Sequence, residues 1–337
     1  MANIFLRSPY FISKVGTTGW NSVKVNIEIG GVDVYTLIKN KVVEAEPVLF
    51  EVSELIRDYL NIEIDSNINP ISHSVVATID TTVYEGLNAT GTVQSTVSTD
   101  FFGIDAYGYF EEGSNPTTTR GYMQSNNVIY TLNGDPIVIP IDRNNTSLVE
   151  FYNEGVFIGD DVIAPSVTEF FQYVTTPDEI GEVRITTTEG IKIIDVITID
   201  ECRFNPHKIS FVNRWGGIQD LYFFKKSIET LNAKRETYKN STITNTGTYD
   251  SLIHARKDFN IQSTKEITLN SGYVSEDYNA PMQELMQSEQ VWMTVNNVIT
   301  PMNVKDSSFV FKTSLNDKMV DYKLQLTYAF DAINNIR

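Results

Sequence analysis

The sequence predicts a mainly β protein, with antiparallel β-sandwich or barrel-like domains and one or two short helices. The 337 residues include 17 Tyr and 18 Phe and are rich in Thr, Ser and Asn, and β-branched and aromatic side chains suit a pleated, half-buried surface. Apolar and polar residues alternate at a period of two in several stretches, as in strands with one buried face. Clusters of Gly, Pro, Asn and Asp separate these stretches.

The first predicted domain, residues 1–65, is a small β unit with one short helix. Residues 23–29 alternate and stop at a Gly-Gly pair, which is a hairpin turn signal, and the alternation resumes over residues 32–37. A strand over residues 48–52 precedes a helix over residues 54–60. We expect Ser53 to be its N-cap, because a serine oxygen can accept a hydrogen bond from a first-turn amide.

The second predicted domain, residues 66–181, is an acidic, loop-rich β region, either an insertion or a separate domain. From residue 66 to residue 200 the chain holds 4 basic and 19 acidic side chains. Turn clusters separate short strands predicted over residues 75–79, 137–141 and 156–158. Residues 86–100 are polar and poor in large apolar groups, so we expect an exposed loop there.

The third predicted domain, residues 182–337, is a C-terminal β domain with one helix near residues 279–290. Its strands should begin with two hairpins, and Asn279 should cap the helix, with a proline in the first turn. Strands then return. The predicted strands cover residues 183–186, 191–199, 207–213, 218–224, 291–295, 308–313 and 322–330.

Charge and cysteine content exclude several classes of protein. The net charge of −17 combines −18 over residues 1–200 with +1 over residues 201–337, so the chain as a whole repels phosphate, and we do not expect a nucleic-acid partner. The sequence contains no run of eighteen consecutive apolar residues, so we predict no membrane-spanning helix. The single cysteine, Cys202, cannot form an internal disulfide, and the N-terminus lacks the pattern of a signal peptide. We expect synthesis in a reducing cytoplasm, with the protein kept there or released without secretion.

Residues that could carry chemistry are few, and we predict no catalytic, cofactor-binding or metal site. His73, His207 and His254 lack the spacing of metal ligands, and a Cys202–His207 nucleophilic pair would need an activating environment. Acidic pairs occur at 111–112, 160–161 and 178–179. Adjacent acidic residues in turns are usually solvated charges, so these pairs do not predict a catalytic site. Oxygen ligands cluster over residues 142–146 and 159–161, without the twelve-residue calcium loop.

A basic segment, residues 202–265, stands against this acidic background with 11 basic and 5 acidic side chains. It suits an acidic protein neighbour or head-to-tail contact between copies better than nucleic acid. Charged strand edges that prevent unwanted pairing are the simpler interpretation. We expect a subunit contact that involves Arg203, Arg214, Trp215, Lys225, Lys226, Lys234 and Arg235.

The two ends of the chain resemble virion structural proteins of tailed bacteriophages, as found in large marine and Bacteroidetes-type phages. The resemblance lies mainly in residues 201–227 and 236–238. A second set comprises residues 7–10, 50–60, 265–273 and 322–337, together with the helix that leads to Trp292. About 200 residues are covered, and residues 66–180 match no family. The resemblance implies a tail, neck or baseplate component and assigns no active-site residues.

These observations favour a non-enzymatic virion protein that assembles as a homo-oligomeric ring through its β domains, with neighbouring virion proteins as further partners. An alternative is a receptor- or glycan-binding tail module that uses the loops of residues 86–180, because loops on rigid β scaffolds often carry recognition. A second alternative, a hydrolase of envelope polysaccharide, has only the acidic pairs in its favour.

Overall fold

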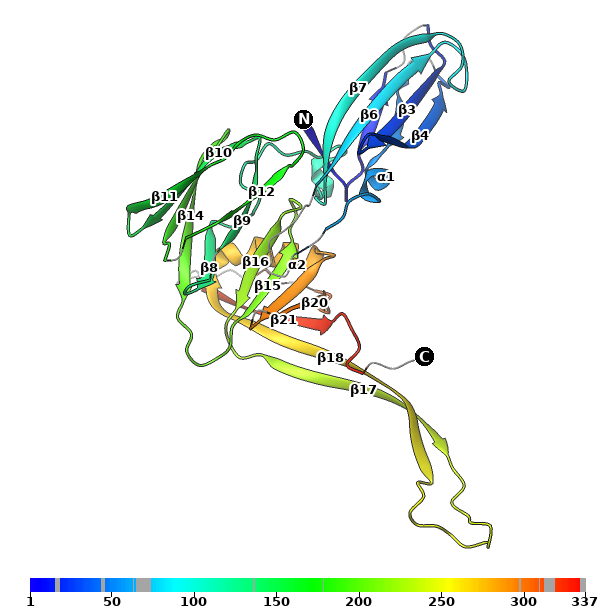
Figure 1. The fold of residues 1–337 in the computed structure, drawn as a ribbon, viewed down its shortest axis with the longest axis vertical. Coiled ribbons are helices and arrows are strands. Elements are labelled where there is room, and N and C mark those ends of the chain that lie inside the picture. Colours follow the sequence, from blue (N-terminus) through cyan, green and yellow to red (C-terminus); the bar gives the residue numbers. More distant parts are fainter. Residues whose placement is uncertain are drawn as a thin grey trace. The chain divides into compact units, whose positions relative to one another are not determined.

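The computed structural model describes residues 1–15, 19–43, 46–62, 64, 74–135, 137–177, 179–296, 298–308, 310–311 and 319–333 (Figure 1). With 55% strand and 7% helix, the predicted mainly β fold is confirmed, and none of the described sheets closes into a barrel. The chain divides into two compact units. Unit 1 comprises Met1–Asp200, Ser210–Leu221 and Asp277–Ser288, and unit 2 comprises Glu201–Ile209, Tyr222–Glu276 and Glu289–Arg337.

The first sheet of unit 1 has the strand order β1-β7-β6-β3-β4. Its strands are β1 (Ala2–Phe5), β3 (Ser22–Ile29), β4 (Val32–Asn40), β6 (Ser74–Tyr84) and β7 (Val93–Ile104). The predicted hairpin joins β3 and β4 through Gly30 and Gly31, whose positive φ angles of 61° and 80° favour glycine. Inward-facing Val23, Val25 and Ile27 are fully buried.

The predicted loop over residues 86–100 is corrected by the structure. β7 begins at Val93 and runs antiparallel to β6, with the hydroxyls of Thr82 and Thr96 3.2 Å apart across the ladder. The prediction was wrong because this half of β7 is mostly exposed and needs no large apolar groups, while Thr and Val still favour a strand. Only residues 85–92 connect the two strands, which shortens the loop that the receptor-binding alternative used.

The first helix is shorter than predicted and begins differently. α1 spans Ser53–Arg57, and its N-cap residue is Val52, without a side-chain capping hydrogen bond. Glu51 accounts for the difference, because its carboxylate accepts hydrogen bonds from both the backbone N–H (2.9 Å) and the hydroxyl of Ser53. The predicted Ser53 cap was therefore wrong. β2 (Phe11–Lys14) and β5 (Val48–Glu51) form a two-stranded antiparallel sheet, and β5 ends just before this helix in the chain.

The second sheet of unit 1 has the order β11-β10-β13-β14-β8, and β9 pairs with β12. The elements are η1 (Phe110–Glu112), β8 (Val128–Leu132), β9 (Val138–Asp142), β10 (Thr146–Asn153), β11 (Val156–Val162), β12 (Phe171–Thr175), β13 (Glu182–Thr187) and β14 (Gly190–Ile199). Val149, Val183 and Ile194 point to one face and are fully buried. The predicted hairpin around residues 187–190 is confirmed.

The hairpin of β15 (His207–Val212) and β16 (Ile218–Phe223) matches the prediction, and its turn belongs to unit 1. α2 (Asn279–Gln287) also belongs to unit 1, and its N-cap residue is Tyr278 rather than the predicted Asn279. The 3-10 turn η2 (Glu276–Tyr278) leads directly into the helix, so Asn279 already has helical neighbours on both sides. None of the helices among the described residues has the length and apolar character needed to cross a membrane.

Unit 2 is built on a sheet of order β16-β15-β19-β20-β21-β18-β17, to which β15 and β16 contribute their ends at Ile209 and Tyr222. The further strands are β17 (Ile228–Lys239), β18 (Arg256–Ser275), β19 (Val291–Val295), β20 (Val298–Val304) and β21 (Met319–Tyr328). Leu269 and Leu324 are paired across β18 and β21, and both are fully buried. Of the strand predicted over residues 308–313, the described positions 308, 310 and 311 are not in a strand, and positions 309, 312 and 313 lie outside the described residues.

The two units divide the chain at other places than the three predicted domains. Residues 1–65 and 66–181 both belong to unit 1, where β3 of the first predicted domain pairs with β6 of the second. Residues 182–337 are shared between the units. The sequence of turns and strands does not reveal this division, because it depends on pairing between distant segments.

Candidate functional site

The histidines and the cysteine of the sequence do not form a catalytic group among the described residues. His207 opens β15 and is buried, and burial lowers the pKa of its imidazole, so it is neutral at pH 7. The charged group that acts on His207 is Glu229, whereas Cys202 is exposed. His254 is exposed, and His73 lies outside the described residues.

The acidic pairs do not converge on a cleft. Asp160 and Asp161 are neighbours on β11, so their side chains point to opposite faces of the sheet and cannot flank one substrate bond. Glu111 is exposed, while Glu112 is bound by an arginine described below. Asp178, the first residue of the third pair, lies outside the described residues.

The oxygen-rich turn after β9 is satisfied internally. The buried carboxylate of Asp142 accepts hydrogen bonds from the backbone N–H of Asn144 (2.8 Å) and the side-chain amide of Asn145 (2.5 Å). Burial nevertheless raises the pKa of this carboxyl. No group of three or more His, Cys, Asp or Glu that could hold a metal ion is found in the described part of the chain.

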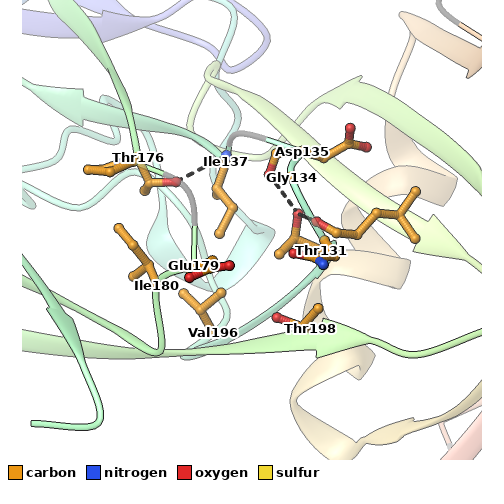
Figure 2. Close-up of a pocket in the computed structure, with 12 residues that line it drawn as sticks. Thr131, Gly134, Asp135, Ile137, Thr176, Glu179, Ile180, Val196 and Thr198 are labelled. Atoms are coloured by element: carbon orange, nitrogen blue, oxygen red, sulfur yellow. Dashed lines mark hydrogen bonds between the residues drawn. The ribbon is translucent and has the colours of Figure 1, made fainter.

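A small cavity lies in unit 1 beside the turn after β8 (Figure 2). Its volume is about 20 Å³, which holds about one water molecule. The hydroxyl of Thr131 donates to the backbone oxygen of Asp135 (3.1 Å), and that of Thr176 accepts from the N–H of Ile137 (3.2 Å). The hydroxyl groups of Thr131 and Thr176 are thus already engaged, as the dashed lines in Figure 2 mark, and the cavity is too small for a substrate.

The turn between β15 and β16 is organised by one buried asparagine. Asn213 accepts hydrogen bonds from the backbone N–H groups of Trp215 (3.0 Å) and Gly217 (3.1 Å). Its amide donates to the backbone oxygen of Met123 (2.7 Å) and to Gln219 (3.1 Å). Because an unpaired buried polar group is destabilising, this network fixes the turn inside unit 1.

Arg214 and Trp215, at the tip of this turn, are engaged inside unit 1. Trp215 is 8% exposed and packs edge-on against Phe5, with ring centroids 6.2 Å apart. The guanidinium of Arg214 forms an ion pair with Glu112 and lies 4.2 Å from the ring centroid of Tyr109. The pairing lowers the pKa of the Glu112 carboxyl. Arg214 and Trp215, two of the seven residues predicted to form a subunit contact, therefore make their contacts within unit 1.

Glu284 of α2 is a buried carboxylate in the same region of unit 1. It accepts a hydrogen bond from the hydroxyl of Ser125 and a longer one, 3.4 Å, from the backbone N–H of Arg214. Burial raises the pKa of its carboxyl, although both partners and the charge of Arg214 act in the opposite direction. Glu284 thus connects α2 with the β15–β16 turn. The rise in its pKa reflects the burial of the carboxyl group away from water.

The hairpin of β17 and β18 has the opposite character. All twelve residues of β17 are exposed, as are residues 256–261 of β18. In Figure 1 this hairpin runs well past the other strands of its sheet. Cross-strand contacts hold it together: the rings of Tyr238 and Phe259 lie 5.6 Å apart, and Thr237 donates to Asp258 (3.0 Å).

The surface of this hairpin is apolar and mixed in charge, with five basic and four acidic side chains over residues 228–261. Large apolar side chains are 37% to 89% exposed; they are Ile228, Leu231, Tyr238, Ile243, Tyr249, Leu252, Ile253, Phe259 and Ile261. Lys234, Arg235 and Lys239 lie on β17, which is the last strand in the order of its sheet. Among the described residues β17 pairs with β18 alone, so its other edge presents free N–H and C=O groups.

Strand β11 forms a second open edge, in unit 1. It is the last strand of its sheet and pairs only with β10 among the described residues. Val156, Phe157 and Val162 are 68%, 50% and 77% exposed. Asp160 and Asp161 make this edge acidic, in contrast to the basic edge of β17.

The other residues of the predicted subunit contact lie in unit 2. Arg203 is exposed over the ring of Phe204, and Lys225 forms an ion pair with Glu201 at 2.5 Å. Lys226 is exposed. Lys234 and Arg235, which are adjacent on β17, are the pair that shares one open strand edge.

Sequence reasoning missed the buried polar residues and the acidic edge. The sequence predicts Asn213 as the last residue of a strand, although asparagine side chains often hydrogen-bond to the backbone of a following turn. It predicts Asp160 and Asp161 as turn residues after a short apolar run. The free edge of a strand cannot be found by alternation at all, since it depends on which strands pair.

No family model matches the chain, and no curated protein shows significant similarity to it.

Proposed function

We propose that the protein is a non-enzymatic structural component of a tailed-phage virion, in the tail, neck or baseplate, where copies assemble into a ring. The observation that carries this proposal is the β17–β18 hairpin, whose strand β17 is exposed at every position and open along one edge. Such an edge invites pairing with another chain. In a virion ring each copy contacts a neighbouring copy, so an open strand edge can form the contact between them.

The composition of the hairpin supports a protein partner. Its exposed apolar side chains, from Ile228 to Ile261, would be poorly placed in a chain that stays alone in water. Its basic residues suit an acidic neighbour, and unit 1 carries acidic residues on an open edge. A head-to-tail contact between such unlike surfaces generates a ring when the rotation closes. The resemblance of residues 201–227 and 236–238 to phage virion proteins supports the same assignment.

Mass spectrometry of purified virions, combined with labelling of the protein for electron microscopy, tests the proposal. We expect the chain in stoichiometric amounts at one level of the tail, neck or baseplate. Absence from purified particles would contradict a structural role. Hydrolysis of host envelope polysaccharide by the purified chain would favour the enzyme alternative instead.

A further inference from the structure

We infer that strand β17 of one copy pairs with strand β11 of a second copy, so that each subunit offers one basic and one acidic strand edge. The inference rests on the proposed assembly and names the surfaces that form it. β17 is the last strand of its sheet in unit 2, and β11 is the last strand of its sheet in unit 1. Each carries free backbone groups on one side in the described part of the chain.

Backbone hydrogen bonding supplies the common basis of this contact. Two open edges can join into one continuous ladder, as when a peptide adds a strand to a sheet. β11 spans Val156–Val162 and β17 spans Ile228–Lys239, so β17 is long enough to cover β11 along its whole length. Both strands are exposed, with Gly159 as the least exposed position of β11.

Charge selects this pair of strands over self-pairing of β11. In an antiparallel register that places Asp160 opposite Asp161 of the other copy, two β11 strands would bring like charges directly opposite each other, which is destabilising. β17 offers Lys234 and Arg235 at adjacent positions instead, and Arg235, which lies 3.6 Å from Asp258 of its own hairpin, is still 57% exposed at its side chain. The acidic pair thus prevents one association and favours the other.

One antiparallel register satisfies charge and apolar contact together. With Lys234 opposite Asp161, Arg235 lies opposite Asp160. Past the irregularity of β11 at Ile158, Phe157 then lies close to Tyr238. Tyr238 and Phe157 are 42% and 50% exposed in the free chain, so the aromatic pair would cover surface that is otherwise in water. The contact is heterologous, because each copy uses a different strand toward each neighbour.

Charge reversal tests the pairing, with the molar mass of the purified full chain measured by light scattering over a range of concentrations. The edge variant is Asp160→Lys with Asp161→Lys, and the hairpin variant is Lys234→Glu with Arg235→Glu. Each alone should raise the dissociation constant of the assembly by about tenfold or more. A 1:1 mixture of the two variants should assemble again, because each reversed strand then meets an oppositely charged strand of the other variant.

Matched controls carry the same change in net charge at exposed positions elsewhere. They are Asp33→Lys with Glu111→Lys for the edge variant, and Lys39→Glu with Lys323→Glu for the hairpin variant; all four residues are exposed. The controls should assemble as the wild-type chain does. Because assembly returns on mixing, a variant that merely fails to fold is distinguished from one that has lost its contact.

Each other outcome overturns the inference in a recognisable way. Loss of assembly in the hairpin variant alone would mean that β17 pairs with a different surface, such as β17 of another copy, and normal assembly of both variants would exclude both strands. A wild-type chain that is monomeric at every concentration would also overturn it. Presence in or absence from virions decides the proposed function separately, so the two can fail independently.

Discussion

Two hairpins that follow each other in the chain, β15–β16 and β17–β18, show how similar sequence signals lead to opposite environments. Both carry arginine or lysine beside an aromatic residue. At the first turn, Arg214 and Trp215 are engaged by Glu112, Tyr109 and Phe5 inside unit 1. On β17, Lys234 and Arg235 are exposed, and the ion pair of Arg235 with Asp258 is exposed as well. The difference is that the polar contacts of the first turn are buried and those of β17 are not.

The comparison teaches that burial, not residue type, separates residues that hold the fold from those that we propose to interact. The first turn is fixed by a buried asparagine that satisfies four hydrogen-bonding groups. The second hairpin is held by its own cross-strand pairs and places its apolar groups in water. Substitutions in the first hairpin should therefore change stability, and substitutions in the second should change association.

The largest effect on stability is expected for Trp215→Ala. Removing a buried tryptophan creates a cavity and should lower the free energy of unfolding by about 3–5 kcal/mol. Urea titration followed by circular dichroism measures this change. Tyr238→Ala on β17 is the matched aromatic control, and we expect its effect to stay within about 1 kcal/mol. Equal losses in the two variants would contradict the contrast between the hairpins.

A smaller loss is expected for Asn213→Ala. The substitution leaves buried N–H and C=O groups without their partner, which should lower the free energy of unfolding by about 1–3 kcal/mol. Asn232→Ala, at an exposed position of β17, is the control and should change stability by less than about 0.5 kcal/mol. The same titration measures both, and an unchanged Asn213→Ala variant would show that the network does not hold the turn.

The pH dependence of stability should change in Glu284→Gln. Burial raises the folded-state pKa of Glu284, so the folded protein binds this proton more tightly than the unfolded chain does. Its contribution is therefore favourable below the unfolded pKa and is lost as the pH rises through the folded pKa. The variant lacks that loss and should gain stability over the wild type as the pH rises from about 4.5 toward 7.

Unfolding measured at several pH values tests this sign, with Glu111→Gln, at an exposed position, as the control. We expect the control to follow the wild type throughout. A Glu284→Gln variant that loses stability relative to the wild type with rising pH would mean that the ionised carboxylate is favoured in the fold.

The smallest effect on stability is expected for Leu231→Ser on β17. The side chain is 61% exposed, so its loss should change the free energy of unfolding by less than about 0.5 kcal/mol. In the proposed register Leu231 lies beyond the end of β11, so assembly, followed by light scattering, should weaken less than in the variant with Lys234→Glu and Arg235→Glu. A large loss of stability in Leu231→Ser would contradict the role assigned to the β17–β18 hairpin.

The strands could be predicted from the sequence where alternation and turn residues agree. The β3–β4 and β13–β14 hairpins were found in this way, and so was the β15–β16 hairpin. β7 was missed, because an exposed strand needs no apolar face. The cap of α1 was missed because Glu51, two residues earlier in the chain, binds Ser53 more strongly. Each error comes from a competing partner or an exposed surface that local pattern does not encode.

The two strand edges that we propose to interact could be predicted from the sequence only in part. Charge counting located a basic segment, and β17 lies within it. It could not separate Arg214 and Trp215 from Lys234 and Arg235, because burial depends on distant partners such as Glu112 and Phe5. The sequence predicts a strand over residues 156–158 only, whereas β11 continues through Asp160 and Asp161 to Val162. The open acidic edge of β11 therefore could not be predicted.

Hydrogen–deuterium exchange of residues 228–239 tests the central claim most directly. In the free chain, the β17 amides that bond to β18 should exchange slowly, and the alternate amides on the open edge should exchange fast. In the assembled form, those alternate amides should become protected, while residues 207–223 change little. Unchanged exchange of β17 on assembly would contradict the account, because the hairpin would then remain uncovered.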